Sequence, residues 1–170
     1  MPGGRVLREA DFSRCPEPYP CDYTDADGAV IYRVAKWLRG SEKSYSVHHP
    51  VPGGWSNGRG GAQRVLYGLP EVLAAIGRGE TVHVVEGEKK AHMLRMLGLV
   101  ATCNDGGAGK FTRAHAESLR EAHRVIVWAD NDEPGKSHVE QTARALHEAG
   151  LRDVRPPVLS GLKHREGLDD

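Results

Sequence analysis

Three acidic residues stand at the carboxyl ends of apolar segments and could together bind a divalent cation. Glu86 follows one such segment, and Asp130 and Asp132 follow the segment Val125–Trp128. Clustered carboxylates repel one another, and a hard cation such as Mg²⁺ relieves that repulsion through oxygen ligands. A magnesium ion shared with substrate phosphates stabilises the charge that develops in phosphoryl transfer. The pattern therefore indicates phosphoryl-transfer chemistry, while the residues alone leave open that these are acids of surface turns and helix caps.

The elements that must position these acids alternate between strands and helices. The expected strands are 81–85, 99–103, 124–129 and 154–159, and the expected helices are 87–97, 112–122 and 135–149. Continuously apolar strands that alternate with amphipathic helices are typical of a parallel sheet covered on both faces. Ligands of such sheets bind beyond the carboxyl ends of the strands. We therefore predict an α/β fold, Rossmann-like with a mostly parallel central sheet, in which the three acids meet if their strands are neighbours.

The first half of the chain has a different character. Residues 1–20 are rich in Pro, Gly and charge and are interpreted as an irregular arm. Residues 21–77 are expected to form a small β-rich unit that ends in a short helix, because a turn at Asp27-Gly28 precedes the β-branched and aromatic run 29–38. The α/β domain is then predicted to occupy residues 78–170.

Composition narrows the protein class without identifying a partner. The 170 residues contain 23 basic and 23 acidic side chains, so the net charge gives no support to a nucleic-acid partner. No apolar segment is long enough to cross a bilayer, and the amino terminus does not resemble a signal peptide. Three cysteines do not make a disulfide framework, and Cys15 and Cys21 are poorly spaced for zinc. These features favour a cytoplasmic protein.

Basic residues are concentrated in the predicted β-rich unit. We expect Arg33, Lys36, Arg59 and Arg64 to contact nucleic acid, since a locally basic surface beside an acidic centre suits an enzyme that acts on a polyanion. Trp55 stands in a glycine-rich loop and is a candidate for stacking on bases. A solvated charged face is the alternative interpretation.

A glycine-rich segment follows the second predicted strand of the α/β domain. Its sequence is Gly-Gly-Ala-Gly-Lys over residues 106–110, and Phe111 follows where an ATPase phosphate loop would have Ser or Thr. The segment is therefore not an ATPase loop. The backbone of Gly107 and Gly109 and the ammonium of Lys110 could still bind a nucleotide phosphate, and an unspecialised surface loop is the alternative.

Five ordered motifs give the sequence a resemblance to a known family. They are Asp27-Gly28, the segment 64–71, Glu-Gly-Glu-Lys at 86–89, the glycine segment 106–110 and Asp-Asn-Asp-x-x-Gly at 130–135. In this order they resemble the TOPRIM domain of phage- and plasmid-type (prophage) DNA primases and primase–helicase-like proteins. The resemblance runs from about Tyr23 to the end of the sequence.

The resemblance implies roles for particular residues. Glu86 matches the family's glutamate, a general acid/base or metal ligand, and Asp130 and Asp132 match its metal-binding pair. It further implies Mg²⁺ or Mn²⁺ as cofactor, single-stranded DNA as template, nucleoside triphosphates as substrates, and a helicase or ATPase domain or partner downstream. One departure is Lys90, which stands where related primases often carry a metal-binding aspartate.

The expected activity is magnesium-dependent nucleotidyl transfer, with RNA primer synthesis by a DNA primase core as its main form. A TOPRIM-type nuclease would use the same acids to cleave a phosphodiester. A non-catalytic nucleic-acid-binding module of a larger replication protein is the third reading, and Lys90 is its best support in the sequence.

Overall fold

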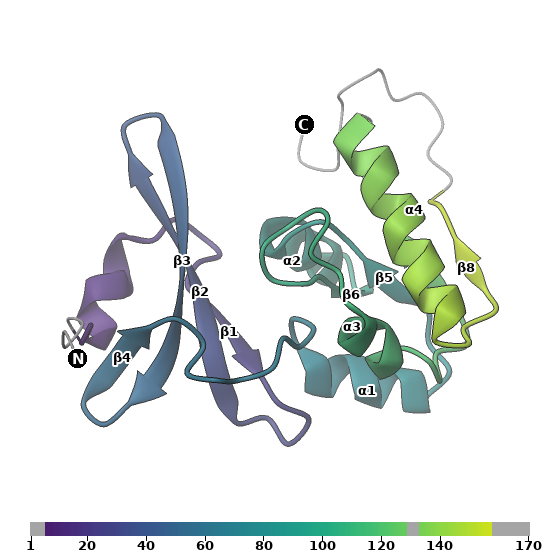
Figure 1. The fold of residues 1–170 in the computed structure, drawn as a ribbon, viewed down its shortest axis with the longest axis horizontal. Coiled ribbons are helices and arrows are strands. Elements are labelled where there is room, and N and C mark those ends of the chain that lie inside the picture. The colour runs from purple at the N-terminus through teal and green to yellow at the C-terminus, as the bar shows by residue number, and fades with distance from the viewer. Residues whose placement is uncertain (1–5, 129–132, 158–170) are drawn as a thin grey trace. The chain divides into compact units, whose positions relative to one another are not determined.

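The structure is a computed structural model that describes residues 6–128 and 133–157 (Figure 1). The chain divides into two units between Gln63 and Arg64. The short helix that follows the division therefore belongs to the second unit, whereas the sequence placed it at the end of the β-rich unit. Within the described residues, no helix is both long and apolar enough to cross a membrane.

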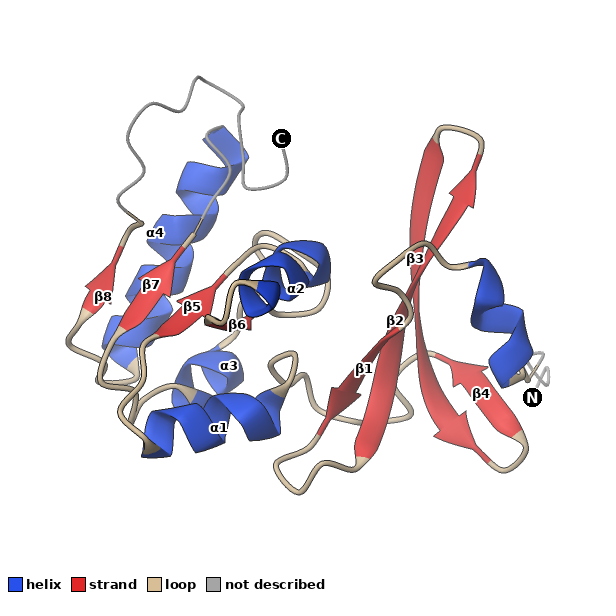
Figure 2. Cartoon of the chain, turned by 180° about the vertical axis from the view of Figure 1, so that it is seen from behind, coloured by secondary structure: helices blue, strands red, loops and turns tan. Residues whose placement is uncertain are grey.

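The first unit is built on a four-stranded antiparallel sheet. Its strands occur in chain order across the sheet, β1 (Cys21–Thr24), β2 (Val30–Arg39), β3 (Glu42–Val51) and β4 (Gly54–Asn57). The turn before β2 forms because the Asp25 carboxylate accepts the N–H groups of Asp27 and Ala29, and Gly28 adopts a φ of 87°. The far end of the β2–β3 hairpin extends beyond the two shorter strands (Figure 2).

The segment before β1 is more regular than the sequence predicts. Residues Glu9–Arg14 form a 3₁₀ helix, and Phe12 in this helix is 2% exposed. Leu7 pairs with Trp55 of β4 through two backbone hydrogen bonds of 2.8 Å. The arm therefore packs on the sheet and contributes to the core of the first unit.

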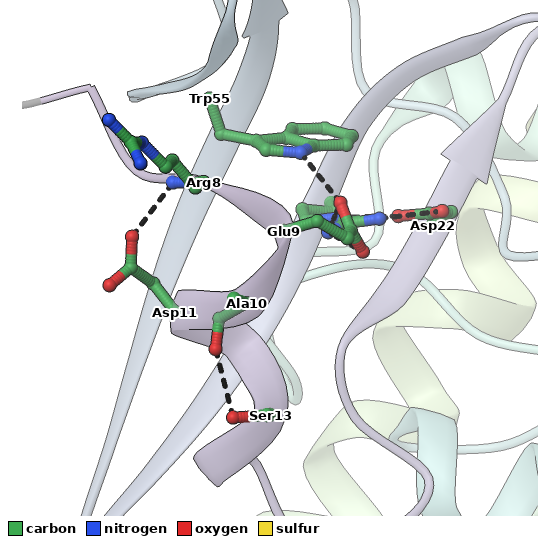
Figure 3. Close-up of polar contacts among 8 residues, drawn as sticks. Arg8, Glu9, Ala10, Asp11, Ser13, Asp22 and Trp55 are labelled. Atoms are coloured by element: carbon green, nitrogen blue, oxygen red, sulfur yellow. Dashed lines mark hydrogen bonds and ion pairs between the residues drawn. The ribbon is translucent and has the colours of Figure 1, made fainter.

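Arg33 of β2 is a buried charged residue within that core. Its guanidinium carbon lies 3.7 Å from the ring centroid of Trp55 and 4.8 Å from that of Phe12. The same group donates to both carboxylate oxygens of Glu9, at 2.8 and 2.9 Å, and of Asp22, at 2.7 and 3.0 Å. Figure 3 shows Glu9 also accepting the Trp55 indole N–H, at 3.0 Å. The buried charge is thus fully paired, as a desolvated guanidinium requires.

The second unit contains a four-stranded parallel sheet. Its strand order is β6 (Val100–Thr102), β5 (Val82–Val84), β7 (Val125–Val127) and β8 (Val154–Arg155). The helices are α1 (Leu69–Gly77), α2 (Glu88–Met96), α3 (Arg113–Ser118) and α4 (Glu133–Glu148). Thr112 is the N-cap residue of α3, and its N–H donates to His115 Nδ1 at 2.9 Å.

Helices cover both faces of this sheet, which confirms the predicted α/β class. Alternate residues of β5 point to opposite faces, so Val82 and Val84 pack in a core that includes residues of α1, α3 and α4. Val85 packs in a separate core with Ala91 and Leu94 of α2. Figures 1 and 2 show α4 and α2 on opposite sides of the sheet.

Candidate active site

Parallel pairing brings the ends of β5 and β7 to one edge of the sheet. Val84 of β5 is in register with Val127 of β7, and the Trp128 N–H donates to the Val84 carbonyl at 2.8 Å. The sequence made the meeting of the acids conditional on these two strands being neighbours, and the strands are neighbours. Glu86 after β5 and Trp128 after β7 therefore leave the sheet at the same carboxyl edge, where ligands of such sheets bind.

Glu86 lies at this edge and has a cationic partner within the chain. Its carboxylate Oε2 is 3.8 Å from the Lys90 ammonium, which lies one turn later at the start of α2. The side chains are 19% and 12% exposed, respectively, so water screens the pair only in part. Glu86 itself precedes α2, whose N-cap residue Gly87 has an extended backbone, so the contact joins the strand end to the first turn of the helix.

The two other predicted metal ligands, Asp130 and Asp132, lie outside the described residues. Within the described part of the chain, no group of three His, Cys, Asp or Glu side chains is placed to hold a metal ion. The donor chemistry of Glu86 suits a hard cation, because its carboxylate is charged, partly exposed and at the carboxyl end of a strand. Lys90 opposes this fit, because its ammonium lies 3.8 Å from the carboxylate and would repel a cation bound there.

The glycine segment after β6 has a fixed base and an exposed tip. Asn104 and Asp105 at the base are fully buried, while Gly109 and Lys110 at the tip are exposed. The Asn104 amide donates to the Gly107 carbonyl at 2.8 Å. Glycine is needed here, because residues 106, 107 and 109 adopt φ values of 84°, 71° and 74°. A rigid base with an exposed amide-rich tip is compatible with the predicted phosphate contact.

His138 of α4 supports this segment and was not recognised in the sequence. It is 1% exposed, and its Nδ1 accepts the Gly109 N–H at 3.4 Å. Burial lowers the pKa of His138, so the ring remains a neutral acceptor near pH 7. No sequence signal links two residues that are 29 positions apart. One of the loop's amide groups is therefore used internally rather than by a ligand.

The four basic residues predicted to contact nucleic acid have different surroundings. Arg33 is buried and paired within the first unit, which favours a structural role. Arg64 donates to the buried Asp105 carboxylate at 3.2 Å and to its carbonyl at 3.1 Å, so it fixes the base of the glycine segment. Arg59 lies over the Tyr32 ring at 5.4 Å. Lys36 is partly exposed beside two tyrosine rings.

Trp55 was the candidate for base stacking, but one face of its ring is already covered by another side chain of the first unit. The Arg33 guanidinium covers the indole at 3.7 Å, and the indole N–H is donated to Glu9. These contacts favour a role for Trp55 in the core of the first unit.

Comparison with solved structures identifies the fold as that of DNA primase catalytic cores. The Aquifex aeolicus primase (zinc-binding and RNA polymerase domains) matches 94% of this chain with a TM-score of 0.68 and 23% identity. The Escherichia coli primase catalytic core matches 87% of it with a TM-score of 0.61 and 22% identity. A DnaG primase catalytic domain bound to single-stranded DNA matches 82% with a TM-score of 0.56 and 23% identity.

The chain spans only part of these proteins, namely 37%, 48% and 42% of their respective lengths. No family model matches the sequence, and no curated protein matches it.

Proposed function

We propose that this chain forms the catalytic core region of a DNA primase and carries out magnesium-dependent nucleotidyl transfer to make RNA primers. The observation that carries the proposal is the adjacency of β5 and β7, which brings the positions after both strands to one sheet edge in a fold that matches primase cores. The motif order of the sequence adds the TOPRIM assignment and the phage or prophage type.

In this proposal the acids and the glycine segment have separate tasks. Glu86, Asp130 and Asp132 would hold the metal ion, with Glu86 alternatively serving as the proton acceptor. When bound, Mg²⁺ would neutralise the negative charge of the substrate phosphates. The backbone of Gly107 and the exposed Lys110 ammonium would bind the phosphates of the incoming nucleoside triphosphate. The Gly109 N–H, which donates to His138, would hold the loop in shape around them.

The chemical step forms one bond and breaks another. The 3′ hydroxyl oxygen of one nucleotide attacks the α-phosphorus of the next, the bond from that phosphorus to the bridging oxygen breaks, and pyrophosphate leaves. The hydroxyl proton passes to Glu86 or to solvent. The template is single-stranded DNA, and a helicase or ATPase domain would act with the core. A reducing cytoplasm suits the three free thiols.

Primer synthesis with purified protein tests this function. The chain is incubated with Mg²⁺ or Mn²⁺ in two parallel reactions, one with unlabelled single-stranded DNA and labelled nucleoside triphosphates and one with end-labelled DNA, and the products are separated by length. We expect growing oligonucleotides from the wild type and none from Glu86→Gln or from Asp130→Asn with Asp132→Asn. Full synthesis by these variants would contradict the proposal, whereas shortened labelled DNA would identify a nuclease.

The ion pair of Glu86 with Lys90 favours a second candidate, a nucleic-acid-binding module without catalysis. An internal cation beside the central carboxylate reduces its attraction for a metal ion. This candidate predicts DNA binding without turnover, and binding that the acid substitutions leave unchanged.

A further inference from the structure

The outer part of the β2–β3 hairpin carries an exposed aromatic and cationic face. Tyr45 is 57% exposed, and its ring meets that of the buried Tyr19 edge-on, with centroids 5.9 Å apart and an interplanar angle of 70°. The Lys36 ammonium lies 5.5 Å from the Tyr19 centroid and 5.7 Å from the Tyr45 centroid. Two neighbours thus hold the Tyr45 ring in place while much of it remains accessible to solvent.

The strand register shows which other residues share this face. Lys36 pairs with Tyr45, and Leu38 pairs with Lys43, so these four side chains point to the same side of the hairpin. Leu38 is 53% exposed. We call this set, together with Tyr19, the tyrosine face. It contains two lysines and no acidic residue.

The opposite side of the hairpin has a different charge pattern. Arg39 pairs with Glu42 there, and Trp37 pairs with Ser44. An open cleft of about 1070 Å³ lies between this side and residues 7–14 and reaches Leu38 and Lys43 at the end of the hairpin; both basic and acidic residues line it, including Arg14, Arg39, Asp11 and Glu42. Mixed charges give this cleft no clear preference for a polyanion.

We propose that the tyrosine face binds single-stranded DNA, with Tyr45 as a stacking platform for a base and Lys36 as a contact for the adjacent phosphate. A fixed, solvent-accessible ring beside an ammonium matches the two needs of single-strand binding, which are stacking and neutralisation of the backbone. Stacking does not require a particular base, so this face reads no sequence. The inference rests on the proposed role of the chain with a single-stranded template, and it identifies the surface of the first unit that binds it.

Fluorescence anisotropy with a labelled single-stranded oligodeoxynucleotide of mixed sequence tests the inference on the whole chain. We expect Tyr45→Ala to weaken binding roughly five- to 100-fold, the range for loss of one stacked base. Tyr45→Phe keeps the ring and should bind within about twofold of wild type. Lys36→Gln should weaken binding and lower the slope of log affinity against log salt by about 0.7.

Arg39→Gln is the matched control, because it removes one positive charge from the same hairpin on the side of the mixed-charge cleft. It should change affinity less than Lys36→Gln. The inference is overturned if wild type does not bind the oligonucleotide, if Tyr45→Ala binds like wild type, or if Arg39→Gln is the more damaging substitution. A face used by a protein partner would give the second of these results.

Separate substitutions distinguish an error in this inference from an error in the proposed function. Glu86→Gln tests primer synthesis and should leave oligonucleotide affinity unchanged, since Glu86 belongs to the second unit. Tyr45→Ala tests template binding and leaves the acids intact. Thermal unfolding of each variant confirms that an exposed substitution has not changed the fold.

Discussion

Replacing Lys90 by methionine removes the ammonium beside Glu86 while keeping an unbranched side chain in the first turn of α2. At the observed 3.8 Å, two unit charges attract by about 1 kcal/mol in water and about 4 kcal/mol at an effective dielectric constant of 20. The pair lies between these limits, because its side chains are 12% and 19% exposed. A divalent cation that binds Glu86 must compete with this attraction and also meets the repulsion of the ammonium.

We therefore expect Lys90→Met to tighten Mg²⁺ or Mn²⁺ binding by about 1–2 kcal/mol, or roughly five- to 30-fold. Calorimetric titration, with electron paramagnetic resonance of Mn²⁺ as an independent measure, reports this without any need for activity. Lys89→Met is the control, since it removes the same charge from the exposed neighbouring position. Glu86→Gln should weaken binding. Unchanged or weaker binding by Lys90→Met would refute the view that Lys90 competes with the metal.

Three further predictions concern the first unit, and chemical denaturation with urea measures each of them. Arg33→Met removes the hydrogen bonds of the buried guanidinium to Glu9 and Asp22, whose carboxylates remain accessible to water, and should lower the free energy of unfolding by about 1.5–3 kcal/mol, whereas the exposed Arg39→Met should change it by less than about 0.5 kcal/mol. Burial lowers the pKa of His48, so the unfolded chain binds a proton more readily; the stability from neutral His48 is present above its unfolded pKa of about 6.5 and is lost as pH falls through that value. His48→Gln should flatten this loss between about pH 7 and pH 5, and an unchanged slope would contradict the assignment. Gly54→Ala would place a Cβ against the Leu7 carbonyl and Val6, whereas Gly53→Ala meets no atom within 4 Å and carries only the backbone strain of its φ of 83°, so Gly54→Ala should be the more destabilising; a smaller loss for Gly54→Ala than for Gly53→Ala would argue against the packing of the arm on β4.

The α/β architecture could be predicted because its signals are local. The apolar segments around Val84 and Val127 and the amphipathic helices between them repeat at the periods of strands and helices. The predicted strands were longer than the observed ones, since β5, β6 and β7 have three residues each. The flanking apolar residues continue into the core without strand pairing, as Val85 does.

The surroundings of individual charged side chains could not be predicted in the same way, because they depend on residues that are distant in the sequence. Arg33 was assigned to a nucleic-acid surface because of its basic neighbours in sequence, but its environment is set by Phe12 and Trp55, which are 21 and 22 positions away. The support of Gly109 by His138 is likewise a long-range contact. The pairing of Lys90 with Glu86 spans only four residues, but it too depends on the extended backbone of Gly87, because Glu86 precedes the first residue of α2.

The packing of residues 7–14 against the first sheet affects where this unit can be cut or fused. A fragment that began at Cys21, the first residue of β1, would lose Phe12 and Glu9, and the Arg33 guanidinium would be left with one carboxylate and an uncovered face. Such a fragment would expose apolar surface and tend to aggregate. An autonomous version of the first unit should therefore keep Leu7 and the residues after it, and a fusion partner at that end needs a linker that leaves the pairing of Leu7 with Trp55 undisturbed.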